Sequence, residues 1–287
     1  MKRLFLLVVV CALSVTPLTA QKSRVTTTSK MLYHDGPVLT GNQNIYVIWY
    51  GCWNSNCGII GDTNTRDILT DFLTSIGNTP YAQINSTYTN SVGAAPNGAF
   101  IYGGDVLDTS YSHGVDLTQS DITGIISDLV NNFLLPQDPN GIYVVMASAD
   151  IASTAMGFCS ASTPSYHGRG IVNGNFVNYI FLGNPMRCPS VAGPWVSTLS
   201  PTPNGSYTAD VLASNLAHGL NTSLTNPAGD GWFDRYGLEN ADKCQNTFGP
   251  TYLTANGAYA NVRFGSRDFL IQQNWVNDRK ARCAMFR

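Results

Sequence analysis

The chain has 287 residues, of which 44% are hydrophobic and only 12% are charged, and its formal net charge is −2. This composition excludes a disordered chain and a collagen-like chain, and it supplies enough apolar residues to bury a core. The small acidic excess gives no support to nucleic-acid binding, because nucleic-acid-binding surfaces are basic.

The first twenty residues have the pattern of a secretory signal peptide. Lys2 and Arg3 form a basic start, residues 4–13 are apolar, and the segment ends on Ala20. The apolar run is far shorter than the roughly 20 residues that a membrane-spanning helix needs. We therefore expect a mature chain of net charge −4 without a membrane span. Its expected location is the extracellular space or the cell wall, or the periplasm in a bacterial host.

The predicted elements alternate between strands and helices. Residues 45–50, 99–102, 142–146 and 177–182 are apolar runs typical of buried strands. Helical spacing of apolar residues predicts helices over residues 68–76, from a capping box at Thr118 towards Pro136, and over residues 208–224. This order predicts an α/β fold with a mixed, buried sheet flanked by helices.

No linker or internal repeat divides the chain. We expect residues 1–20 to be the signal peptide, residues 21–40 a polar leader, and residues 41–287 a single domain.

Six cysteines remain after signal removal, and an even number in an exported chain predicts disulfides. The sequence cannot choose among the many pairings. Cys52 and Cys57 are close enough to form a local pair, and the working assignment for the others is Cys159 with Cys188 and Cys244 with Cys283.

His218 is the most informative candidate site residue, because it lies on the helix face roughly opposite a stripe of leucines. Zinc peptidases place two histidines and a glutamate there as H-E-x-x-H. This chain has Gly219 in place of the glutamate and Thr222 in place of the second histidine. The alternative is a solvent-facing histidine without a ligand. The other histidines, His34, His113 and His167, are predicted to lie in surface loops.

Glu239 is the only glutamate in the chain, and Asp242 follows in the same segment. With His218 these two carboxylates are the candidate metal ligands, and His218 and Glu239 are the candidate catalytic residues of an altered zinc hydrolase. Zinc is the only cofactor that the sequence leaves open. The lost motif favours a protein without catalytic activity.

Surface binding is the remaining class. Trp53, Trp195, Trp232 and Trp275 lie beside Gly, Pro or Asn, where aromatic rings can either stack on sugars or cover the core. The last 25 residues are basic, as expected of a solvated tail or of a contact with an anionic polysaccharide. Asn85, Asn204 and Asn221 begin glycosylation sequons.

Several motifs resemble those of the phosphate-induced, EXORDIUM-like family. They are Tyr33-His34-Asp35-Gly36, Trp49-Tyr50-Gly51, Gly157-Phe158-Cys159, Leu182-Gly183-Asn184, Arg187-Cys188-Pro189, the run from Thr225 to Phe233, and Ala241-Asp242-Lys243-Cys244. The resemblance implies a secreted protein of the cell wall or extracellular space, linked to growth or nutrient response, without an established enzymatic activity. Its expected partners are extracellular or wall components, either polysaccharide or protein. The helix of His218 also resembles that of zincin-type peptidases, from which Gly219 and Thr222 depart.

Overall fold

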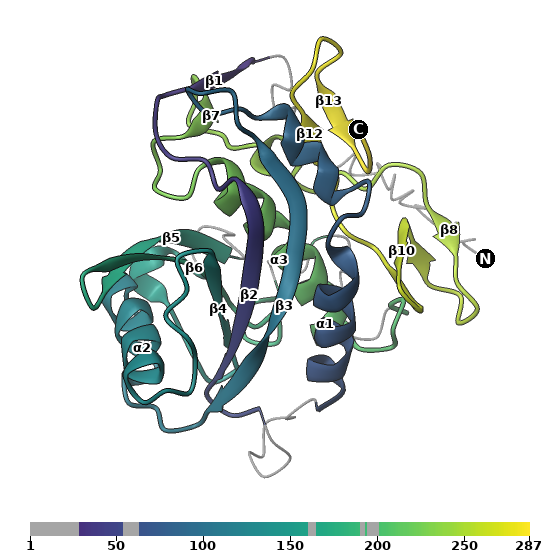
Figure 1. The fold of residues 1–287 in the computed structure, drawn as a ribbon. Helices are drawn as coiled ribbons and strands as arrows, with labels where there is room; N and C mark the ends of the chain where they lie inside the picture. Colours follow the sequence, from purple (N-terminus) through teal and green to yellow (C-terminus); the bar gives the residue numbers. More distant parts are fainter. Residues whose placement is uncertain (1–28, 54–62, 160–164, 190–192, 194–200) are drawn as a thin grey trace, which may run out of the picture.

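A five-stranded sheet forms the centre of the protein, in the order β3-β2-β4-β6-β5 (Figure 1). The computed structural model describes residues 29–53, 63–159, 165–189, 193 and 201–287. Strands β2, β3, β4 and β6 are parallel, and β5 is antiparallel to β6. The sheet strands are β2 (Gly41–Tyr50), β3 (Pro96–Asp108), β4 (Gly141–Ala147), β5 (Ser165–Val172) and β6 (Asn175–Leu182). This arrangement confirms the predicted α/β fold with a mixed sheet.

The four predicted strands correspond to β2, β3, β4 and β6; the predicted runs in β2, β4 and β6 are buried, whereas in β3 Ala99 and Phe100 are buried and Ile101 is exposed. β5 is an additional strand in a segment that the sequence analysis assigned to loop. It joins β6 through Asn173 and Gly174, both of which have positive φ. A two-residue Asn-Gly loop is a strong hairpin signal, so this strand could have been predicted.

Three α-helices cover the sheet: α1 (Thr63–Ile76), α2 (Gln119–Asn131) and α3 (Tyr207–Thr225). All three were predicted. The capping box of α2 is formed, with Thr118 accepting from the main chain of Asp121. This helix ends earlier than its apolar stripe suggested, because Phe133 adopts a left-handed conformation with φ of 58° and its side chain is exposed.

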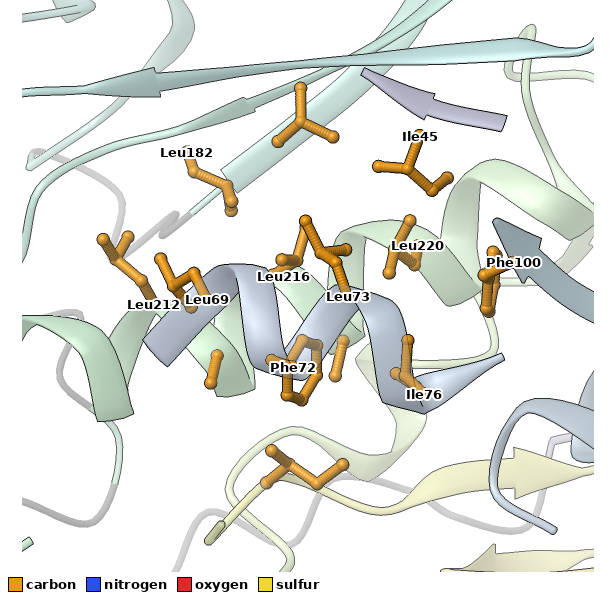
Figure 2. Packing of buried hydrophobic residues seen from close by; sticks show 14 of the residues in the cluster. Ile45, Leu69, Phe72, Leu73, Ile76, Phe100, Leu182, Leu212, Leu216 and Leu220 are labelled. Atoms are coloured by element: carbon orange, nitrogen blue, oxygen red, sulfur yellow. The ribbon is translucent and has the colours of Figure 1, made fainter. Parts of the chain in front are cut away.

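The sheet has an apolar core on each face. α2 packs on one face, where Ile122, Ile125 and Ile126 meet the side chains of Tyr143 and Val145. α1 and α3 pack together on the other face. Figure 2 shows leucines of both helices, with Phe72 and Ile76 of α1, gathered below Ile45 and Leu182 of the sheet. The leucine stripe of α3 therefore fixes which face of that helix turns away from the sheet.

Segments before and after the sheet add small two-stranded elements. β1 (Met31–Tyr33) pairs with β7 (Trp232–Asp234), so part of the predicted leader, residues 31–33, belongs to the fold. The predicted signal peptide lies outside the described residues. The C-terminal region has three hairpins, formed by β8 (Tyr252–Leu253) with β9 (Tyr259–Ala260), β10 (Val262–Phe264) with β11 (Arg267–Phe269), and β12 (Asn274–Val276) with β13 (Arg282–Ala284). Short 3₁₀ helices lie at η1 (Ala82–Thr87), η2 (Thr154–Met156) and η4 (Asp242–Cys244).

Two disulfides confirm the working assignment of the cysteines. Cys159 pairs with Cys188, with Cα atoms 5.3 Å apart, and Cys244 pairs with Cys283, with Cα atoms 5.5 Å apart. Both Cα separations are ordinary for a disulfide. The third predicted pair, Cys52 with Cys57, includes a residue outside the described part of the chain.

No helix in the described ranges is long and apolar enough to span a bilayer.

Candidate functional site

His218 lies in the second half of α3, and its side chain is only 12% exposed. It is therefore not the solvent-facing histidine that the sequence left open as an alternative. Its Nε2 atom is 3.2 Å from Oδ1 of Asp242, which lies at the start of η4. A carboxylate can only accept, so Nε2 carries the hydrogen. The fold thus brings together two of the three predicted metal-site residues.

The two positions where α3 departs from H-E-x-x-H do not face this site. A Cβ atom on Gly219 would lie 2.8 Å from Cγ2 of Ile180 on β6, so this position faces the sheet. Thr222 is buried, and its hydroxyl lies within hydrogen-bond distance of the main-chain oxygens of His218 and Gly219. Neither position of the helix supplies a second polar group to His218.

Glu239, the third predicted residue, joins the site together with His167 of β5. The Nε2 atom of His167 is 3.4 Å from Oε1 of Glu239 and 2.9 Å from the main-chain oxygen of Asn226. Asn226, which caps the C-terminal end of α3, also donates from its side chain to Oε1 of Glu239. Two imidazoles and two carboxylates from three parts of the chain therefore form one cluster, which we call the α3 cluster: His167, His218, Glu239 and Asp242.

Opposing effects set the protonation of the α3 cluster. Burial alone would lower the pKa of His218, but the hydrogen bond and charge of Asp242 outweigh it, and the pKa lies above its ordinary value of 6.5. Burial would raise the pKa of Asp242, yet the hydrogen bond from His218 holds it below its ordinary value. Burial raises the pKa of Glu239, and the nearby His167 only partly offsets this effect. The contact with Asp242 thus favours the protonated form of His218, whereas Glu239 holds a proton more readily than an exposed glutamate.

A small cavity of about 190 Å³ opens beside the cluster. Glu239 and Asp242 form its acidic side, and Phe233 is its only aromatic lining residue. The ring of His34 covers one face of Phe233, with centroids 3.5 Å apart and the ring planes within 2° of parallel. The remaining lining residues are Asn226, Gly229 and Gly237. The cavity is smaller than the roughly 300 Å³ at which ligand pockets usually begin, so it suits one end group of a larger molecule.

The candidate zinc ligands His218, Glu239 and Asp242 lie in the α3 cluster. Within the described ranges, no group of three or more His, Cys, Asp or Glu side chains is arranged to hold a metal ion. In the α3 cluster the imidazoles and carboxylates instead bond to each other. Among the described residues, the candidate zinc ligands therefore contact each other, and zinc binding stays a prediction.

The asparagine side chains of the candidate sequons are hydrogen-bonded within the fold. Asn85 and Asn221 are buried and hydrogen-bonded to each other, with Nδ2 of Asn85 2.6 Å from Oδ1 of Asn221. The side-chain amide of Asn204 donates to Asp210 and to the main chain of Asp268. A glycan on Asn85 or Asn221 would have no room in this fold, and one on Asn204 would break these two hydrogen bonds.

The loop tryptophans are mostly interior. Trp53 and Trp275 are buried, Trp232 is half-buried, and Trp195 lies outside the described residues. Basic side chains near the C-terminus form ion pairs, such as Arg267 with Asp71 at 2.6 Å. Among the described tryptophans outside the central strands, Trp232 alone therefore keeps partly exposed surface.

Two residues of the site were missed by sequence reasoning. His167 was predicted to lie in a surface loop, because its segment is rich in glycine, and Asn226 was included only in the motif run from Thr225 to Phe233. The Asn173-Gly174 hairpin signal would have placed His167 on a strand. No sequence signal would have placed that strand beside α3, because this contact depends on the order of strands in the sheet.

Comparison with known proteins agrees with the motifs. The family model described as the phosphate-induced protein 1 conserved region matches residues 31–285. The chain is 28% identical to Protein EXORDIUM-like 3 of Arabidopsis thaliana, over 86% of this chain and 80% of that protein. It is 26% identical to Protein PHOSPHATE-INDUCED 1 of Nicotiana tabacum, over 79% of this chain and 74% of that protein.

No solved structure matches the chain, so its resemblance to zincin-type peptidases stays a prediction. The family model spans nearly all of the described residues, from β1 to the last hairpin. The chain therefore belongs to the phosphate-induced protein 1 family, as its motifs predicted.

Proposed function

We propose that this protein is exported and acts in the extracellular space or the cell wall by binding, without hydrolysis, in a growth or nutrient-response context. Two features support export: the signal-like residues 1–20, and the disulfides Cys159–Cys188 and Cys244–Cys283. Disulfides of this kind persist in oxidising compartments. Family membership supports the growth or nutrient-response context, because two relatives are named for phosphate induction and for EXORDIUM.

One observation carries the choice of binding over hydrolysis: both imidazoles beside the cavity are already in contact with a carboxylate. His218 is paired with Asp242, and His167 lies beside Glu239. A hydrolytic site needs a base that can reach an attacking water, held by a metal or by an open hydrogen-bonding position. The glutamate that would act beside His218 is Gly219, and that position faces β6. The cavity offers a binding recess instead.

Binding is tested with mature protein and insoluble plant cell-wall material in a sedimentation assay. Glu239→Ala removes an acidic wall of the cavity, so we expect it to reduce the bound fraction several-fold. Asp128→Ala is the matched control, because Asp128 is an exposed carboxylate on α2, which packs on the opposite face of the sheet. Equal binding of both variants and wild type would place the binding surface elsewhere, and absence of binding by wild type would refute the proposal.

The rival function is a metal-dependent hydrolase that uses His218, Glu239 and Asp242. The observation in its favour is that His167 raises the number of nearby side chains able to bind a metal to four. Elemental mass spectrometry on protein purified without chelators and then offered zinc separates the two functions. We expect no stoichiometric metal. Stoichiometric zinc that is lost in His218→Ala would overturn the binding proposal and justify a peptide-substrate screen.

A further inference from the structure

The hydrogen-bond donors and acceptors that line the cavity beside the α3 cluster are not equally free to bind a ligand. The main-chain N–H groups of Gly229, Gly237 and Glu239 all donate within their own loop. Oε1 of Glu239 accepts from the Asn226 side chain, and both oxygens of Asp242 are engaged, one by His218 and one by the main chain of Glu239. Among the described residues, Oε2 of Glu239 has no hydrogen-bond donor. The cavity therefore presents an acceptor and few free donors.

The charged groups at the cavity further restrict which class of ligand can bind. An anionic group such as a uronate, phosphate or sulfate would meet two carboxyl groups without a free donor, and like charges in contact cost several kcal/mol. A cationic group would find Asp242 already paired with His218 and Glu239 already beside His167. A neutral hydroxyl donates to Oε2 of Glu239 without displacing either imidazole.

The size and the lining of the cavity also favour a neutral ligand group. The cavity of about 190 Å³ holds one ring or one short end group, and the loop glycines Gly229 and Gly237 leave its rim open. Phe233 supplies an apolar wall that His34 holds in place by stacking. An apolar wall beside a hydrogen-bond acceptor matches a sugar ring, which carries C–H groups on its faces and hydroxyls at its edge.

We propose that the cavity binds one neutral sugar unit of a wall polysaccharide, with a sugar hydroxyl donating to Oε2 of Glu239. This inference rests on the proposed binding function and names its ligand class. It also predicts which polysaccharides are rejected: those whose units carry a carboxylate, and those whose units carry a free amine.

The experiment is isothermal titration calorimetry of the full mature protein with tetrasaccharides of three kinds. The neutral probes are the tetramers of β-1,4-glucose, β-1,4-xylose and β-1,4-galactose, the acidic probe is tetragalacturonate, and the amino probe is the tetramer of glucosamine. We expect at least one neutral tetramer to bind, with both charged tetramers at least tenfold weaker.

The variant Glu239→Gln tests the role of Oε2. Its amide oxygen keeps the bond from Asn226, and its amide nitrogen replaces the acceptor with a donor. Loss of this one hydrogen bond weakens binding of the neutral tetramer by about twofold to tenfold. Asp128→Asn is the matched control and should bind as wild type. Thermal unfolding of each variant checks that the fold is kept.

Each other outcome overturns the inference. These outcomes are tighter binding of the acidic or the amino tetramer, no binding of any neutral tetramer, and unchanged binding by folded Glu239→Gln. If wall material still binds in a Glu239-dependent way while no neutral tetramer does, the proposed function stands and only the ligand class fails. If wall material does not bind at all, the proposed function itself fails.

Discussion

A fully buried ion pair joins the two ends of the loop that lines the cavity. Removing one of its partners should strongly lower the free energy of unfolding. Nζ of Lys243 lies 3.1 Å from Oδ2 of Asp234, and both side chains have no exposed surface. Lys243 also donates to the main-chain oxygen of Ser29 at 2.7 Å and lies 4.6 Å from the centre of the Trp275 ring. Glu239 lies between the two partners in the chain, so the pair holds both ends of its loop.

Lys243→Met removes the cation but keeps most of the side-chain volume. It leaves the carboxylate of Asp234 buried without its cation, accepting from the main-chain N–H groups of Tyr236 and Leu238. Removing one partner of a buried pair costs about 3–5 kcal/mol. At roughly 2–4 °C per kcal/mol for a domain of this size class, the melting temperature should fall by about 6–20 °C.

The second substitution, Asp234→Asn, tests the reasoning. The asparagine oxygen still accepts from Tyr236 and Leu238, and its amide leaves no buried charge. We therefore expect Lys243→Met combined with Asp234→Asn to recover most of the loss, to within about 2 kcal/mol of wild type. Urea unfolding with the disulfides intact measures both variants.

Two results would refute this account. A loss below about 1 kcal/mol in Lys243→Met would mean that the pair is not buried as described. A double variant as unstable as the single one would mean that lost packing, and not an unpaired charge, causes the effect.

Three further predictions concern the site helix and its surroundings. The pairing of His218 with Asp242 stabilises the fold fully only between pH 3.8, the ordinary pKa of aspartate, and pH 6.5, the ordinary pKa of histidine. This stability is lost as the pH rises through the raised pKa of His218. It is also lost as the pH falls through the lowered pKa of Asp242. In Asp242→Asn the buried imidazole loses its partner, so urea midpoints should instead rise with pH through the histidine range, and an unaltered profile would contradict the pairing. Gly219→Ala should lower the free energy of unfolding by about 1–3 kcal/mol through overpacking on β6. The higher helix propensity of alanine offsets about 1 kcal/mol of this loss. A more stable variant in thermal denaturation would show that β6 moves to make room for the methyl group. Replacing Cys244 and Cys283 with alanine opens a link across 39 residues of sequence, which corresponds to about 4 kcal/mol in chemical denaturation, and a loss below about 1 kcal/mol would rule out this contribution.

Local chemistry explains which elements were predicted from the sequence. The capping box at Thr118 and the leucine spacing of α3 act within a few residues, so they define helices without reference to the rest of the chain. The apolar runs of β2, β4 and β6 are buried on both faces, which makes them continuous and easy to recognise. The α/β class follows from these elements.

Other features depended on contacts between distant segments. β5 is an edge strand containing Gly168 and Gly170, so it lacks the apolar pattern of the central strands. Trp53 and Trp275 lie beside turn-forming residues, yet both are buried, Trp53 against Trp49 of β2 and Trp275 within β12. Lys243 of η4 is fully buried, which its residue type would not suggest, because it is paired with Asp234 of β7.

The sequence by itself determined the helices, the central strands and the family, and it singled out His218, Glu239 and Asp242 as a candidate group. It did so because amphipathic spacing, capping and characteristic motifs are local in the chain. Only the tertiary structure decided that His167 joins these residues, that Gly219 faces the sheet, and that the imidazoles and carboxylates pair with each other beside a small cavity. These facts depend on how β5, α3 and the loop after α3 pack against each other, and packing between distant segments leaves no periodic signal in one sequence.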